Sequence, residues 1–138
     1  VARLLVGLFR LIVRGRGGMD ILIGGKGRDK LYGGADRMRD VFVYETIYDS
    51  KIGTNRDVIY DFESGIDDID LTAIDANVLK SGDQAFRFTG PRAAAHSVWT
   101  YDIGRNLLLR GDVNGDARHD FEIEIVNVPA LVARDLLL

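Results

Sequence analysis

Large apolar residues recur at a fixed spacing in the first third of the chain. Four of them stand nine residues apart and a fifth follows after eleven: Leu4, Val13, Leu22, Leu31 and Phe42. A period of this length is the signature of a repeat architecture in which each unit contributes one short strand. The two extra residues before Phe42 indicate an insertion at 35–39 that leaves the strand in register. The first thirteen residues are then eroded repeat units, with an amphipathic or capping helix as the alternative.

After Tyr44 the pattern changes to the alternation that is typical of half-buried strands. The clearest case is FEIEI at 121–125. Gly104-Arg105 separates two apolar runs and predicts a hairpin. Pro129 suits the first turn of a short helix through Val132. We therefore predict a single all-β domain over 1–138, in which a short parallel β-roll over 1–44 continues into an antiparallel β-sandwich over 45–138 with a short C-terminal helix.

The residues between the apolar positions of the repeats follow a pattern of their own. Residues 24–32, GGKGRDKLY, satisfy every fixed position of the glycine-rich nonapeptide G-G-x-G-x-D-x-U-x, where U is a large apolar residue. The unit at 15–23 departs from it once, with Arg16 at the second glycine. In the third unit the insertion moves the loop aspartate to Asp40. Glycines permit positive φ in such loops, and aspartate and carbonyl oxygens are the ligands that calcium prefers.

Two strands complete one turn of such a roll, so each loop stacks on the loop two units further on. Asp20 and Asp40 are therefore predicted to share one ion. Asp29 needs a downstream partner, either Asp57 or Asp61, because Leu11 stands where the preceding aspartate belongs. We expect one or two calcium ions in all. The residues predicted to supply further oxygens from the loops are Gly15, Gly17, Gly24, Lys26, Gly33 and Ala35.

A second group of oxygen-bearing side chains follows Gly111. Asp112, Asn114, Asp116 and Asp120 stand at positions 1, 3, 5 and 9 of a loop, as in an EF-hand-like calcium site. Ala117 stands where such a loop has glycine, and no glutamate stands at position 12. Aspartate and asparagine also favour plain turns, so a polar turn before the strand at 121–125 is the alternative.

Composition and charge limit the other possibilities. The chain has no cysteine, which excludes disulfides and thiolate metal sites. Its two histidines form no H-E-x-x-H motif, and there is no G-x-S-x-G or phosphate-binding loop, so we predict no catalytic site. The apolar N-terminal stretch is too short for a membrane span, and no nucleic-acid partner is expected. Residues 1–40 hold nine Lys and Arg against four Asp and Glu, and a basic repeat region disfavours tight cation binding.

The chain resembles the C-terminal calcium-binding module of serralysin-type secreted metalloproteases, within the repeats-in-toxin (RTX) proteins. The resemblance rests on blocks in order along nearly the whole chain: GGKGRDKLYGG, DVFVY, DVIYDFESGIDDIDLTAIDA, GDQAFRF, GDVNGDARHDFEIEI and VPALVARDLLL. Here only one nonapeptide is intact, and Arg16, Asp36, Met38 and Ala117 replace residues that the family pattern has as Gly or Asp.

The resemblance implies a non-catalytic module that follows an effector or protease domain absent from this chain. It implies that the module is unfolded in the calcium-poor cytosol, is exported by a type I ABC transporter and folds outside the cell on binding calcium. Asp135 followed by three leucines looks like the uncleaved C-terminal signal of that family. Extracellular localisation follows from the same resemblance.

Two other functions stay open. The chain is a polysaccharide-binding module if its basic stretch binds an anionic polymer; that stretch contains Arg14, Arg16, Lys26, Arg28 and Lys30. It is a degenerate structural remnant if it folds without ion or ligand. A calcium titration and a polysaccharide titration distinguish the three.

Overall fold

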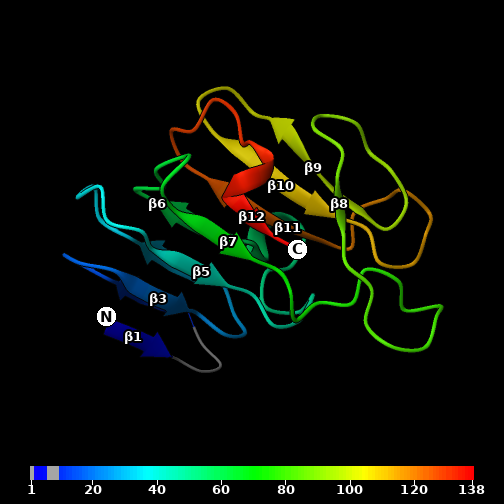
Figure 1. Ribbon diagram of the computed structural model, residues 1–138, viewed down its shortest axis with the longest axis horizontal. Helices are drawn as coiled ribbons and strands as arrows, with labels where there is room; N and C mark the ends of the chain where they lie inside the picture. The colour runs from blue at the N-terminus through cyan, green and yellow to red at the C-terminus, as the bar shows by residue number, and fades with distance from the viewer. Residues whose placement is uncertain (1, 6–9) are drawn as a thin grey trace.

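The computed structural model describes residues 2–5 and 10–138 and consists of two β-sheets. The first sheet has five strands, in the order β1 (Ala2–Leu5), β3 (Asp20–Ile23), β5 (Val41–Val43), β7 (Asp68–Asp70) and β12 (Leu136–Leu137). Figure 1 shows these strands side by side, beginning at the N-terminus and ending with the C-terminal strand against β7. All their pairings are parallel.

The second sheet has seven strands, and its first part is also parallel. Its order is β2 (Ile12–Arg14), β4 (Lys30–Tyr32), β6 (Asp57–Tyr60), β11 (Phe121–Ile125), β10 (Leu107–Gly111), β9 (Ser97–Asp102) and β8 (Arg87–Phe88). Antiparallel pairing is confined to β9, β10 and β11 within this sheet. Successive strands of residues 2–70 alternate between the two sheets, which is the path of a parallel β-roll.

The register confirms the apolar period of the sequence. Leu4 lies opposite Leu22, and Val13 lies opposite Leu31, so one full turn takes eighteen residues. Leu22 lies opposite Phe42, which confirms the two-residue insertion. The first residues are therefore repeat strands, and the helical alternative is wrong for 2–5 and 12–14; residues 6–9 of that expectation lie outside the described residues.

The parallel roll is longer than predicted. Three strands after residue 44 continue the parallel pairing. Ile59 lies opposite Leu31, and Ile69 lies opposite Phe42. Leu136 in turn lies opposite Ile69. The predicted antiparallel sandwich over 45–138 is thus replaced in part by roll strands. The nine-residue period does not reveal these later strands, because the connections between them are longer than nine residues. Each strand still places a buried apolar residue opposite that of the preceding turn. The hairpin at Gly104-Arg105 is confirmed as the turn between β9 and β10.

The helix predicted from Pro129 through Val132 is not formed. The chain instead makes a 3₁₀ turn, η2 (Ala133–Asp135), and then adds β12 to β7. Leu131 and Leu136 are buried, and the extended end of the chain lets them join the same core as the roll residues. A second 3₁₀ turn, η1 (Gly53–Asn55), precedes β6. Within the described residues, no helix is long and apolar enough to cross a membrane.

Candidate metal sites

Five buried aspartates stand at equivalent places in the roll. Each comes two residues before a fully buried apolar strand residue, in the pattern D-x-U, and each is at most 2% exposed. They are Asp20, Asp29, Asp40, Asp57 and Asp67. The strand pairing brings them together in two columns, one along each edge of the roll.

The first column runs through Asp20, Asp40 and Asp67. The Asp20 amide donates to Oδ1 of Asp40 at 3.0 Å, and the Asp40 amide donates to Oδ1 of Asp67 at 2.9 Å. Oδ2 of Asp67 accepts the Glu63 amide at 2.8 Å, so both oxygens of this last carboxylate are engaged. The loops at 15–20 and 33–40 therefore stack as predicted, and the Gly18 amide also donates to Oδ2 of Asp36 in the insertion.

The second column supplies the partner of Asp29. The Leu11 amide donates to Oδ1 of Asp29 at 2.9 Å, and the Asp29 amide donates to Oδ1 of Asp57 at 2.8 Å. The Asp57 amide donates to the Ser50 hydroxyl, which ends the column. Of the two candidates, Asp57 is the neighbour of Asp29, whereas Asp61 is exposed and follows the strand.

The first glycine of each repeat is required by the aspartate of the same repeat. A Cβ on Gly24 would lie 2.6 Å from Oδ2 of Asp29, and one on Gly33 would lie 2.7 Å from Oδ2 of Asp40. Gly15 stands in the same relation to Asp20. These three glycines leave room for the carboxylates. The second position of each repeat has a positive φ. Arg16 occupies this position in the first repeat with a φ of 70°, so the turn is kept although the motif has glycine there.

The columns are electrostatically costly without a cation. Burial raises the pKa of Asp57 to about 8, and the nearby carboxylate of Asp29 contributes to the increase. Burial likewise raises the pKa of Asp40 to about 7, with further contributions from Asp67 and Asp20. The pKa of Asp29 is about 6 for the same reason. A bound dication would stabilise the ionised form of all three carboxylates.

The residues present fit calcium. Oδ2 of Asp29 and Oδ2 of Asp40 are buried and make no hydrogen bond, so each column offers a carboxylate oxygen without a donor. Calcium takes six to eight oxygens, more than two carboxylates supply. Of the predicted additional residues, Gly15, Gly24 and Gly33 lie against the aspartate of their own repeat. Gly17, Lys26 and Ala35 belong to the same loops, and their role as ligands stays a prediction.

The loop after β10 forms a separate acidic group. Asp112, Asp116 and Asp120 place carboxylate oxygens within 4.8 Å of one another, the one such group of three acidic residues among the described residues. Asp112 is fully buried; its Oδ2 accepts the amides of His96 and Gly115, while its Oδ1 has no hydrogen-bond partner. Asn114 belongs to the same loop, since its Oδ1 accepts the Asp116 amide. All four predicted residues of this loop therefore lie together.

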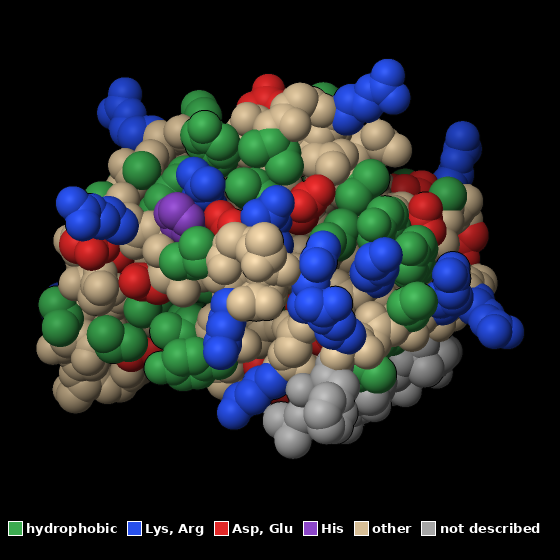
Figure 2. Space-filling view, turned by 180° about the vertical axis from the view of Figure 1, so that it is seen from behind, with side chains coloured by type: hydrophobic (Ala, Val, Ile, Leu, Met, Phe, Trp, Pro, Cys, Tyr) green, Lys and Arg blue, Asp and Glu red, His purple; other side chains and the backbone are tan. Residues whose placement is uncertain are grey.

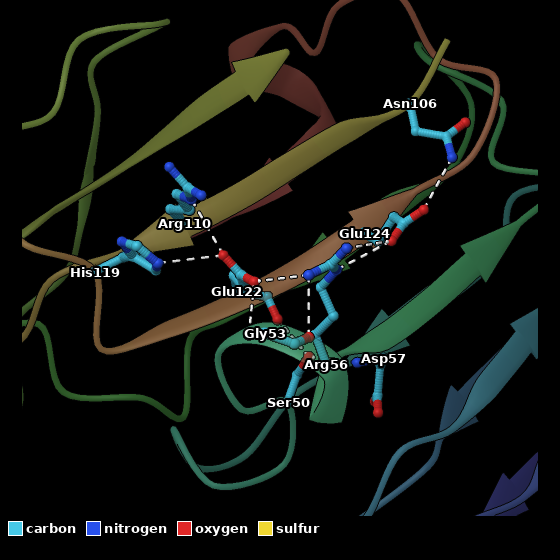
Figure 3. Close-up of polar contacts among 9 residues, drawn as sticks. All are labelled: Ser50, Gly53, Arg56, Asp57, Asn106, Arg110, His119, Glu122 and Glu124. Atoms are coloured by element: carbon cyan, nitrogen blue, oxygen red, sulfur yellow. Dashed lines mark hydrogen bonds and ion pairs between the residues drawn. The ribbon is translucent and has the colours of Figure 1, made fainter. Parts of the chain in front are cut away.

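A charged cluster outside these sites has its acidic groups paired with basic side chains of the same chain. Figure 3 shows Glu122 between Arg56, Arg110 and His119. Glu122 is 2% exposed and also accepts the Gly53 amide, and these donors outweigh its burial and lower its pKa. Arg56 also pairs with Glu124, which ties the segment before β6 to β11. The cluster thus links the segment before the parallel strand β6 to the antiparallel strands β10 and β11 of the second sheet.

The parallel roll with its aspartate columns is the fold of an RTX-type repeat module, and the comparisons with known proteins agree. The family described as Peptidase M10 serralysin C terminal matches residues 14–138, and the chain belongs to this family. A comparison with curated proteins finds no match.

Two solved structures are similar to the chain. One is the solution structure of the AlgE6R3 subunit from the Azotobacter vinelandii mannuronan C5-epimerase, with 28% identity and a TM-score of 0.60, covering 99% of this chain and 77% of that one. The AlgE6R2 subunit of the same epimerase has 23% identity and a TM-score of 0.57, covering 97% of this chain and 91% of that one. The second likeness supports the fold alone.

Asp67 and Ser50 are the column residues that the sequence reasoning missed. Asp67-Asp68-Ile69 carries the same D-x-U triad as the intact repeats, so a search for that triad without the glycines would have found Asp67. Ser50 has no comparable signal, since it reaches Asp57 from an irregular loop.

Proposed function

We propose that this chain is a non-catalytic calcium-binding module that is stabilised by calcium and belongs to a larger extracellular protein. The observation that carries the proposal is the pair of buried aspartate columns, in which Oδ2 of Asp29 and Oδ2 of Asp40 have no hydrogen-bond donor and face Gly24 and Gly33 of the repeat loops. Membership of the serralysin C-terminal family supports the same function.

Two ions are proposed for the roll. One is held between Asp20 and Asp40, and the other between Asp29 and Asp57, each with carbonyl oxygens of the stacked loops. Calcium bound there supplies charge neutralisation and a link between successive turns. Asp67 ends its column, and both of its carboxylate oxygens accept backbone amides, from Asp40 and Glu63. We therefore assign no ion to Asp67.

The loop at 112–120 is proposed as a weaker third cation site. Asp112 provides a buried oxygen, and Asn114, Asp116 and Asp120 provide the others. Because Asp112 also accepts the His96 amide, an ion here would fix the end of the hairpin against the segment before β9.

The absence of catalysis is also a proposal, and the use of the polar side chains supports it. His96 contacts the Ala76 carbonyl through Nδ1 at 2.8 Å, and His119 pairs with Glu122. These are the two histidines of the chain. Both are engaged in contacts that hold segments of the fold together.

Type I export is also proposed, and membership of the serralysin C-terminal family supports it. Asp135 is fully buried, and it accepts the Ser64 hydroxyl and the Gly65 amide. The leucines that follow it form β12 in the first sheet. Because Asp135 and the leucines after it are part of the folded core, we propose that the transporter recognises this segment in the unfolded chain.

A calcium titration tests the central proposal. Calcium should raise the melting temperature and the β-sheet circular dichroism signal of the chain relative to chelator, while magnesium at the same concentration should have little effect. A variant carrying Asp29→Asn and Asp40→Asn should lose most of the response and keep only what the weaker loop at 112–120 contributes, and Asp61→Asn should keep the full response. Identical melting in calcium and in chelator would favour the metal-free remnant.

A further inference from the structure

A basic cavity lies on the outside of the roll, beside the loop that carries Asp29. It has a volume of about 760 Å³ and is lined by Arg10, Lys26, Gly27, Arg28, Tyr48, Lys51 and Asn55. Four of these seven residues are cations, and none of the described lining residues is acidic. Volumes of this size are typical of ligand sites.

A second cavity of about 350 Å³ extends the first along the strands. It shares Arg10 and Arg28 with the larger cavity and adds Lys30 on β4 and the exposed Ile12 on β2. The two cavities are adjacent because they share these two arginines, and together they are called the basic groove. Figure 2 shows the face of the second sheet, where Lys and Arg side chains gather.

The chain builds this groove from segments that are far apart in sequence. Lys26 and Arg28 come from the intact repeat loop, while Lys51 and Asn55 come from the connection between β5 and β6. Like charges brought together in this way repel one another and are stabilised by an anion bound between them. The arrangement is therefore suited to an anionic ligand.

The groove also offers groups that suit a sugar. Tyr48 is 58% exposed at the cavity and presents a ring face on which a pyranose can lie. The Asn55 amide can donate to and accept from hydroxyl groups. Arg10 and Arg28 can each hold a carboxylate through two parallel hydrogen bonds. A ligand with a carboxylate on every ring and hydroxyls between them matches this set.

We propose that this groove binds an acidic polysaccharide built of hexuronic acids. A nucleic acid is a poorer match, because a single strand needs a longer charged track with several stacking rings. Residues 41–138 carry nine Lys and Arg against seventeen Asp and Glu, so most of the remaining chain repels a long polyanion. The proposal goes beyond calcium binding, since it assigns a ligand to the cations on the outside of the loop and not to its buried aspartate.

Titration of the full chain in calcium with a galacturonate oligomer, followed by amide chemical shifts, tests the proposal. The shifts should concentrate at Lys26, Arg28, Lys51 and Asn55. The carboxyl-reduced, neutral oligomer is the matched ligand control and should bind far more weakly. A melting curve of the same sample reports separately on calcium stabilisation, so failure of one proposal is distinguishable from failure of the other.

Variants locate the site. Arg28→Gln and Lys51→Gln, taken from separate segments, should each weaken oligomer binding about two- to five-fold, as expected for one partly exposed charge pair. Arg105→Gln, in the β9–β10 turn, removes an exposed cation elsewhere and should leave affinity unchanged. Circular dichroism checks that each variant is folded.

Three results would overturn the proposal. The first is equal binding of the neutral oligomer. The second is affinity for single-stranded DNA or inorganic phosphate that matches or exceeds affinity for the galacturonate oligomer. The third is an affinity that Arg28→Gln and Lys51→Gln both leave unchanged in folded protein.

Discussion

Replacing Asp57 by asparagine should have opposite effects on stability with and without calcium. Asparagine keeps the size of the side chain and an oxygen that can accept the Asp29 amide, but it cannot ionise. In chelator this change stabilises the fold, because folding no longer requires a carboxylate to be protonated or buried with its charge. In calcium the same change removes a proposed ligand and destabilises the fold relative to the parent chain.

The magnitude in chelator follows from the pKa. The pKa of Asp57 is about 8 in the folded chain and about 4 in an unfolded chain. At pH 7 the difference costs at most ~4 kcal/mol of folding free energy, since about three pH units separate pH 7 from the unfolded value. Structural relaxation and water reduce this cost, so we expect Asp57→Asn to stabilise the calcium-free chain by about 2 kcal/mol.

The pH dependence of folding stability tests the direction of this effect independently. A carboxyl group whose pKa is raised on folding contributes stability that is complete below pH ~4 and is lost as the pH rises through ~8. The calcium-free parent should therefore become less stable across this window, and Asp57→Asn should reduce the slope. In calcium the ranking reverses, because an ion at a hundredfold excess over its Kd contributes about 2.7 kcal/mol that the variant loses.

Urea unfolding at several pH values, in calcium and in chelator, measures both effects. Asp61→Asn is the matched control, since Asp61 is exposed and has a positive φ of 62° that asparagine also tolerates. If Asp57→Asn shifts stability in the same direction in calcium and in chelator, the assignment of Asp57 to a cation site is wrong.

Three further changes test the loops and the C-terminal end. Gly24→Ala should destabilise the chain by about 1–3 kcal/mol in urea unfolding, because its Cβ would overlap Asp29; Gly17→Ala, whose Cβ meets nothing closer than 3.8 Å, should be nearly neutral. Ala117→Gly should stabilise by about 1 kcal/mol in the same assay, because Ala117 has a φ of 60°, and an unchanged midpoint would count against strain there. Asp135→Ala should cost about 3 kcal/mol, since three donors lose their buried acceptor. Asp135→Asn keeps one acceptor oxygen and should cost less, and equal losses would mean that this neutral oxygen does not replace the carboxylate.

The sequence predicted the start of the roll well because one buried residue per turn is a local and repeated signal. Leu22 and Leu31 lie where the period places them, and the insertion before Phe42 changes only the loop. The same signal could also have chosen between the two partners of Asp29. Asp57 precedes Ile59 by two residues, as in an intact repeat, whereas Asp61 follows it.

The later roll strands could not be predicted in the same way. The connection from Phe42 to Ile69 spans 27 residues, so no period is left to count. The pairing of Leu136 with Ile69 joins segments 67 residues apart, and a short leucine run carries no information about its partner strand. Burial of Asp135 against Ser64 and Gly65 is equally non-local, and these contacts favour the extended end of the chain over a helix after Pro129.

The basic charge of the repeat region argued against cation binding, but the basic side chains and the aspartates lie on different sides of the loop. In the intact loop Asp29 is fully buried in its column, whereas Lys26 and Arg28 line the groove on the outside. Buried charges are screened little by salt, and exposed ones are screened strongly. Raising the ionic strength should therefore weaken oligouronate binding while leaving calcium stabilisation largely intact. A parallel loss of both would mean that the loop does not separate the two charges as its geometry indicates.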